Sequence, residues 1–120
     1  MQSIYDRIQY YKIDDKRKEN LINKLKALLV NEKQVKLAWL FGSVTRHESV
    51  RDIDVAVQAE PEFSFSEYLD LNVKIELELG IPVDMVEIRK VPESLRQNIL
   101  KNGVLIKGKN PSRPIKKANV

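Results

Sequence analysis

Apolar residues recur every three or four positions in several stretches of the chain, and this spacing predicts amphipathic helices. Each of the longer stretches carries a boundary signal, such as an acidic pair or a capping box at its start or a glycine at its end. The expected helices are a short one at residues 4–11, one of roughly fifteen residues from Asp14, one from Ser64 to Gly80, and one from Pro92 to just before Gly103.

Four shorter apolar runs predict strands, because they are continuous and end at turn residues. The run at residues 35–41 is apolar throughout most of its length, as in a strand that is covered on both faces. The alternation of helices and strands predicts an α+β fold, a small mixed sheet backed by helices. The expected strands are residues 35–41, 52–58, 82–88 and 104–106, with the last of them at a sheet edge.

Length and composition limit the class of protein. A chain of 120 residues forms one domain with a modest core, which we expect over residues 1–106. No run approaches the ~18 apolar residues of a membrane span, and the N-terminus lacks the pattern of a signal peptide. The absence of cysteine excludes disulfides and thiolate metal sites and is compatible with a cytoplasmic protein.

The net charge of +4 is unevenly distributed along the chain. Residues 35–100 carry a balance of −5, whereas residues 101–120 contain six basic residues and no acid. An acidic middle suits a metal site, for which oxygen ligands are the expected donors because the chain has one histidine. The irregular basic tail at residues 107–120 could contact nucleic acid or an acidic partner, or it could be a solvated terminus.

Asp52 and Asp54 are the first candidates for chemistry. Side chains two positions apart on a strand share a face, so the two carboxylates stand side by side while Ile53 faces the core. Carboxylates this close repel each other, and a divalent cation removes the conflict by taking their oxygens as ligands. The alternative is a pair of acids at a solvent-exposed strand entry, with Arg51 as a counter-charge.

Asp84 strengthens the case for a metal site. It lies within the apolar run at residues 82–88, where an unpaired buried carboxylate would cost several kcal/mol or take up a proton. It therefore needs a cation or a basic partner. If its strand lies beside the strand of Asp52 and Asp54, the three acids converge.

The dipeptide Gly42-Ser43 follows the apolar run at residues 35–41 and could begin a helical turn. Glycine allows the backbone to approach a phosphate closely, and the serine offers a hydroxyl and an N–H. The dipeptide alone is a common loop. Its value lies in the order of the parts: strand, Gly-Ser, loop, Asp-x-Asp strand, helix, and a strand with a further acid.

In that order the chain resembles the nucleotidyltransferase superfamily of the DNA polymerase β type. The pieces that carry the resemblance are Gly42-Ser43, Asp52-Ile53-Asp54 and Asp84, and the likeness runs from about residue 35 to residue 106. The small size, without an added recognition domain, is similar to the minimal nucleotidyltransferase (MNT) family. Several members of that family are antitoxins paired with HEPN-domain toxins.

The resemblance implies a nucleotidyltransferase fold and a transfer of AMP from ATP, or of another nucleotide from its triphosphate. Asp52, Asp54 and Asp84 would be the catalytic residues and would hold two Mg²⁺ ions, with Asp84 beside the attacking hydroxyl. Gly42 and Ser43 would cradle the phosphates, with Arg46 as a further contact. In toxin-paired members the acceptor is a tyrosine hydroxyl of the HEPN-domain partner.

The chain departs from the family pattern near the phosphate loop. Members often carry Arg-Gly shortly after the Gly-Ser, where this chain has Arg46-His47, and many place serine before the first acid, where it has Arg51. Arg46 could contact phosphate or pair with a core acid, and His47 is expected to be solvated. Trp39 is expected in the core, and Glu87 on the face opposite to Asp84.

Two functions other than an enzyme remain open. The chain could be a non-catalytic binding module that neutralises a partner by contact, or a nucleic-acid-binding domain that uses its basic tail. The presence of all three acids favours the enzyme, because a contact-only module would be free to lose them. Loss of salt-dependent binding after deletion of residues 107–120 would instead identify a nucleic-acid-binding tail.

Overall fold

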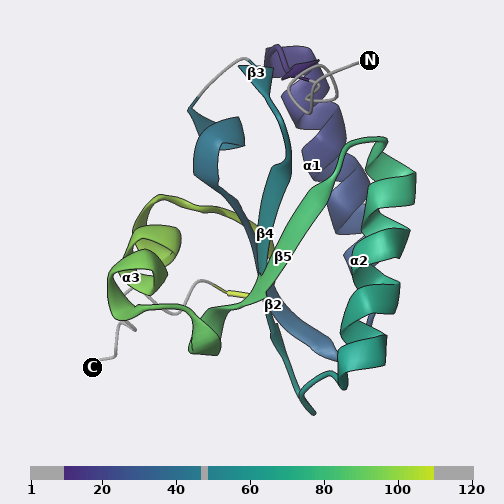
Figure 1. Cartoon of the computed structure of the whole chain (residues 1–120), viewed down its shortest axis with the longest axis vertical. Coiled ribbons are helices and arrows are strands. Elements are labelled where there is room, and N and C mark those ends of the chain that lie inside the picture. Colours follow the sequence, from purple (N-terminus) through teal and green to yellow (C-terminus); the bar gives the residue numbers. More distant parts are fainter. Residues whose placement is uncertain (1–9, 47–48, 110–120) are drawn as a thin grey trace, which may run out of the picture.

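A four-stranded mixed sheet forms the centre of the fold in the computed structural model, which describes residues 10–46 and 49–109 (Figure 1). The strand order is β5-β4-β2-β6, in which β2 is antiparallel to β4 and β6 while β4 and β5 are parallel. The predicted mixed sheet is therefore confirmed, with strand boundaries that differ from the prediction by at most one residue. The strands are β2 (Val35–Phe41), β4 (Ile53–Ala59), β5 (Val83–Glu87) and β6 (Val104–Lys107).

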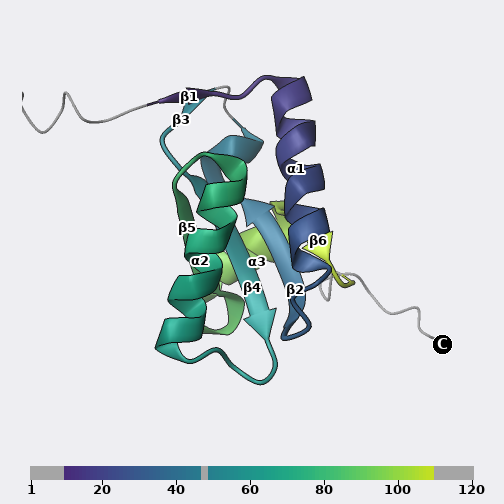
Figure 2. The ribbon, with the colours of Figure 1, turned by 90° about the vertical axis from the view of Figure 1, so that its right-hand side faces the viewer.

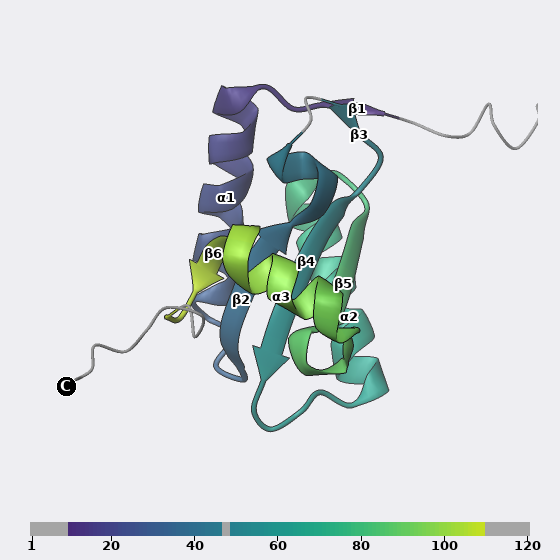
Figure 3. The ribbon, with the colours of Figure 1, turned by 90° about the vertical axis from the view of Figure 1, so that its left-hand side faces the viewer.

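Three helices cover the sheet, two on one face and one on the other. Figure 2 shows α1 (Asp15–Leu29) and α2 (Phe65–Leu79) side by side in front of the sheet. Figure 3 shows α3 (Glu93–Asn102) lying across the opposite face. The predicted capping box is present at the start of α2, and Gly80 ends this helix in the left-handed conformation at φ 72°.

Each face of the sheet has its own apolar cluster. The larger cluster lies under α1 and α2 and includes Leu25, Ile75 and Val55. The smaller cluster lies under α3, where Ile99 packs near Trp39. Trp39 is fully buried, which confirms that it is a core residue and not a base-stacking one.

A second, two-stranded sheet was not expected from the sequence. It pairs β1 (Tyr11–Lys12) with β3 (Ser49–Val50) in antiparallel register. The predicted short helix over residues 4–11 is wrong at Tyr11, because cross-strand pairing with a segment far along the chain outweighs the local apolar spacing. The prediction is wrong at Tyr10 as well, which is not helical, and residues 4–9 lie outside the described residues.

Lys107 was assigned to the basic tail, but it lies in β6 and is tied to α1. Its ammonium donates to the backbone carbonyls of Leu29, at 2.8 Å, and of Glu32, at 2.9 Å. Carbonyls at a helix C-terminus have no partner within the helix, so this cation satisfies part of the end of α1. Residues 110–120 of the predicted tail lie outside the described residues.

None of the described helices combines the length and the apolar content needed to cross a membrane. In α1 and α2, polar side chains alternate with the buried leucines and isoleucines at helical spacing. The buried leucines and isoleucines of both helices cover the sheet.

Candidate active site at the end of the central strands

The sheet brings three of the predicted segments together at one end. Phe41 at the end of β2 lies opposite Asp54 of β4, and Asp54 lies opposite Asp84 of β5. Gly42 follows Phe41 directly, so it reaches the same place. The strand register therefore places the Gly-Ser turn close to the acids, as expected.

Gly42 lies against the carboxylate of Asp54. A Cβ atom added at Gly42 would come within 2.1 Å of Asp54 Oδ2, and the backbone here has a φ of +83°. Both the space and the backbone conformation therefore require glycine. As a result, the loop backbone is closer to this acid than any other residue type would allow.

The segment after Gly42 forms a single turn of 3₁₀ helix, η2 (Gly42–Thr45). The Thr45 hydroxyl donates to the Gly42 carbonyl at 2.7 Å, and the Arg46 backbone N–H donates to the Ser43 carbonyl at 2.9 Å. The sequence-based expectation that a helical turn begins at Gly42-Ser43 is confirmed. These bonds fix the loop beside Asp54.

The electrostatics of Asp54 reflect its acidic neighbours. The pKa of this half-buried carboxyl is raised to about 6, first by burial and then by the charges of Asp52 and Asp84. Negative charge is therefore costly at the centre of the cluster. This is the condition that a bound cation relieves.

Asp84 differs from the expectation of a buried acid. Its side chain is exposed, and it lies on β5, an edge strand of the described sheet. The reason is the position of α3, which packs on Trp39 and Ala56, farther along the strands, and leaves the acidic end uncovered. Asp84 is therefore open to the surroundings.

The charge of Asp84 also affects a tyrosine of α2. The pKa of the half-buried Tyr68 in α2 is raised, first by burial and then by the charge of Asp84. The phenol of α2 and the acid of β5 therefore lie within electrostatic reach of each other.

No three acidic, histidine or cysteine side chains among residues 10–46 and 49–109 are placed so that they would hold a metal ion. The predicted triad of Asp52, Asp54 and Asp84 is therefore brought together by the fold without being arranged as a finished metal site. The residues still suit Mg²⁺, since they offer carboxylate oxygens with an unfavourable mutual charge. Asp54 and Asp84 lie opposite each other on neighbouring strands, which are ~4.8 Å apart.

A cavity of about 540 Å³ adjoins the glycine turn. Arg46 lies on its rim, exposed and paired with no acid in the described part of the chain. The opposite wall is α3, from which Asn98 and Asn102 face the cavity. The sequence prediction missed these two asparagines, although their four-residue spacing on a helix was a signal that they share a face. The lining residues are Phe41, Gly42, Thr45, Arg46, Asn98, Asn102 and Val104.

The remaining candidates lie away from the acids or outside the description. Arg51 is exposed, and His47 lies outside the described residues. Glu87 accepts hydrogen bonds from Arg89 and, at 3.3 Å, from the Ala59 backbone N–H. This engagement agrees with the prediction that Glu87 is no part of the acidic cluster.

Comparison with known proteins agrees with the nucleotidyltransferase resemblance of the sequence motifs. The sequence profile of the family described as Polymerase beta, Nucleotidyltransferase matches residues 23–112. A protein of Methanocaldococcus jannaschii, named as a candidate protein adenylyltransferase, is 32% identical over 77 residues, which is 61% of this chain and 77% of that protein.

Two solved structures share the fold. A crystal structure of a toxin–antitoxin with AMP-PNP has a TM-score of 0.63 and 30% identity, and the match covers 73% of each chain. A tri-AMPylated HEPN toxin of Shewanella oneidensis in complex with MNT antitoxin gives a TM-score of 0.62 and 28% identity, over 77% of this chain and 73% of that one. The family profile spans most of the chain, and the acids and glycine turn lie inside it. The chain therefore belongs to the polymerase beta nucleotidyltransferase family.

Proposed function

We propose that this chain is a Mg²⁺-dependent nucleotidyltransferase that moves AMP from ATP to a tyrosine hydroxyl of a HEPN-domain partner, as the antitoxin of such a pair. The observation that carries the proposal is the contact of Gly42 with Asp54 at the open, acidic end of the sheet. The toxin–antitoxin structures with AMP-PNP and with an AMPylated HEPN toxin support the choice of donor and acceptor.

Each group of residues has a distinct role in this proposal. Asp52, Asp54 and Asp84 would hold the metal ions, which when bound neutralise phosphate charge and activate the acceptor oxygen. The backbone at Gly42 and Ser43 would receive the phosphates, because no Cβ blocks the approach at Gly42. Positioning and charge neutralisation would supply most of the rate enhancement.

The proposed transfer forms one bond to phosphorus and breaks another. The acceptor oxygen forms a bond to the α-phosphorus of ATP, the bond from that phosphorus to the bridging oxygen of the β-phosphate breaks, and pyrophosphate leaves. The proton of the acceptor hydroxyl goes to Asp84 or, through it, to solvent. The exposure of Asp84 suits this role, since the acceptor belongs to a second protein and must reach it.

The position of a radioactive label in ATP distinguishes AMP transfer from phosphate transfer. Incubation of the full chain with Mg²⁺ and a HEPN-domain protein should transfer label from α-³²P-ATP but none from γ-³²P-ATP. Asp54→Asn should lose the transfer, whereas Glu19→Gln, a change of an exposed acid on α1 outside the site, should retain it. Transfer of the γ-label would identify phosphorylation and contradict the proposal.

A contact-only binding module is the second candidate, and one observation favours it. The three acids are not arranged as a finished metal site within the described part of the chain. A module of this kind would neutralise its partner without nucleotide. If Asp54→Asn protects cells from the partner as well as the wild-type chain does, the contact-only function is correct.

A further inference from the structure

An exposed apolar stripe runs along the whole of α2. It consists of Phe65, Leu69, Val73 and Leu77, whose exposed fractions are 77%, 45%, 50% and 80%. We call these four residues the α2 stripe. Residues four apart on a helix are neighbours, so the stripe is continuous over about 18 Å.

The α2 stripe has no role in the core of this chain. A separate set of α2 side chains, Leu71, Ile75 and Leu79, is buried against the sheet. Single exposed apolar residues are ordinary in proteins, but a contiguous row is typical of a surface that another molecule covers. The helix is thus apolar on two sides, and only one of them is used within the fold.

The C-terminal end of the stripe lies close to the start of β5, the strand that carries Asp84. Glu76, which lies beside Leu77, accepts a hydrogen bond at 2.8 Å from the backbone N–H of Val83. Val83 directly precedes Asp84. A molecule that covered this end of α2 would therefore reach the acid to which we assigned the acceptor hydroxyl.

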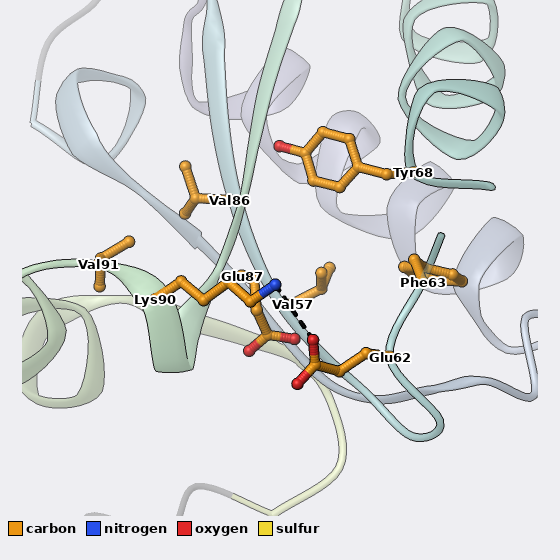
Figure 4. Close-up of a pocket in the computed structure, with 8 residues that line it drawn as sticks. All are labelled: Val57, Glu62, Phe63, Tyr68, Val86, Glu87, Lys90 and Val91. Carbon is orange, nitrogen blue, oxygen red and sulfur yellow. Dashed lines mark ion pairs between the residues drawn. The ribbon is translucent and has the colours of Figure 1, made fainter. Parts of the chain in front are cut away.

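A pocket of about 320 Å³ lies near the other end of α2, where Tyr68, the neighbour of Leu69 along the helix, is one of its lining residues. Figure 4 shows Tyr68 on one side of it and Val86 and Val91 on the other, with the ion pair of Lys90 and Glu62 at its edge, at 3.1 Å. Tyr68 lies within electrostatic reach of Asp84. The pocket lies next to β5, which is an edge strand of the described sheet, so no further strand closes it.

The charges of α2 indicate the chemistry of the molecule that covers it. The helix contains four acids and one lysine, Lys74, which is bound to Glu32 of the α1 side at 2.7 Å. Two copies of this chain that met through α2 would place acidic helices against each other. A partner with basic residues around an apolar ridge would meet complementary charge.

We propose that the α2 stripe and the adjoining pocket dock the acceptor protein, through an apolar ridge rimmed by lysine and arginine, and so present its hydroxyl to Asp84. This inference rests on the proposed transfer function and adds the surface that selects the acceptor. The stripe supplies apolar contact, the pocket takes one apolar or aromatic side chain, and Asp70 beside the stripe contacts the basic rim.

The test separates docking from catalysis. The full chain is incubated with Mg²⁺, α-³²P-ATP and the soluble proteins of the cells that make it, and labelled proteins are counted on a gel. Leu69→Ser/Leu77→Ser should lower labelling by about tenfold or more, and Asp70→Lys should lower it as well. Val30→Ser, at an apolar residue that is 65% exposed and directly follows α1, is the matched control and should change nothing. The thermal shift of each variant with Mg²⁺ and ATP should equal that of the wild type.

Each outcome has a distinct meaning. Equal labelling by the stripe variants and the wild type overturns the docking surface alone. A loss of dimer mass by light scattering in the stripe variants, with labelling intact, identifies a second copy as the occupant and also overturns it. Labelling that rises in the variants would mean that a segment of this chain covers the stripe. No labelled protein with the wild-type chain overturns the proposed function, and this inference with it.

Discussion

At the scale of single residues, the contact between Gly42 and Asp54 determines the shape of the site. The left-handed backbone at Gly42 turns the chain out of β2, and the missing Cβ leaves room for the carboxylate. The other left-handed glycine at a helix end, Gly80, has open space around its Cβ position. Comparing the same substitution at the two glycines therefore distinguishes the cost of a left-handed backbone from the effect of contact with Asp54.

Gly42→Ala should abolish nucleotide binding and lower stability, because the added methyl group displaces Asp54. Gly80→Ala, the matched control, meets no neighbour and should cost only the left-handed backbone strain, about 1–2 kcal/mol. Urea unfolding and the thermal shift with Mg²⁺ and ATP measure both effects. If Gly42→Ala binds nucleotide as well as Gly80→Ala does, the close approach has no function.

Asp54→Asn should stabilise the metal-free chain at pH 7.5. A carboxyl whose pKa rises to about 6 on folding holds its proton more tightly when folded, so its contribution to stability falls as pH rises from about 4 to 6. The gain should be about 1 kcal/mol after allowance for partial exposure, and it should vanish near pH 4. Thermal unfolding in EDTA at the two pH values measures it; an equal gain at both values would contradict the electrostatic cause.

At the scale of elements, apolar spacing predicted the long helices and the four strands because each one buries a regular set of side chains in the core. It failed for β1, whose two residues depend on a partner thirty-nine positions away at Tyr11 and Val50. It also failed for the burial of Asp84. An alternating pattern shows which face a residue takes, but the uncovered end of the sheet depends on where α3 crosses it.

The link from β6 to α1 gives a prediction at this scale. Lys107→Met should lower the free energy of unfolding by about 1–2 kcal/mol, since the carbonyls of Leu29 and Glu32 each lose the charged one of their two donors. Lys109→Met changes an exposed lysine two positions later and should be neutral. Urea denaturation of the two variants compares them directly; equal stabilities would show that the ammonium does not cap α1.

At the scale of the whole molecule, the sequence predicts which residues form the acidic cluster and the glycine turn. Their proximity, however, depends on the strand order. The parallel pairing of β4 with β5 places Asp54 opposite Asp84, which no local pattern contains. Asn98 and Asn102 reach the cavity beside the turn only because α3 crosses the sheet there. The sequence therefore indicated the chemistry, and the topology determines which groups meet.

The central claim is that the acidic end of the sheet binds a nucleoside triphosphate together with Mg²⁺. The most direct measurement is the thermal midpoint of the full chain with ATP, CTP, GTP or UTP, each with and without Mg²⁺, beside Asp54→Asn. A ligand at a hundred times its Kd adds about 2.7 kcal/mol, so a rise is expected with ATP and Mg²⁺ together and should be lost in Asp54→Asn. A rise that is independent of Mg²⁺, or that persists in Asp54→Asn, would contradict the account, and so would the absence of a rise with every nucleotide.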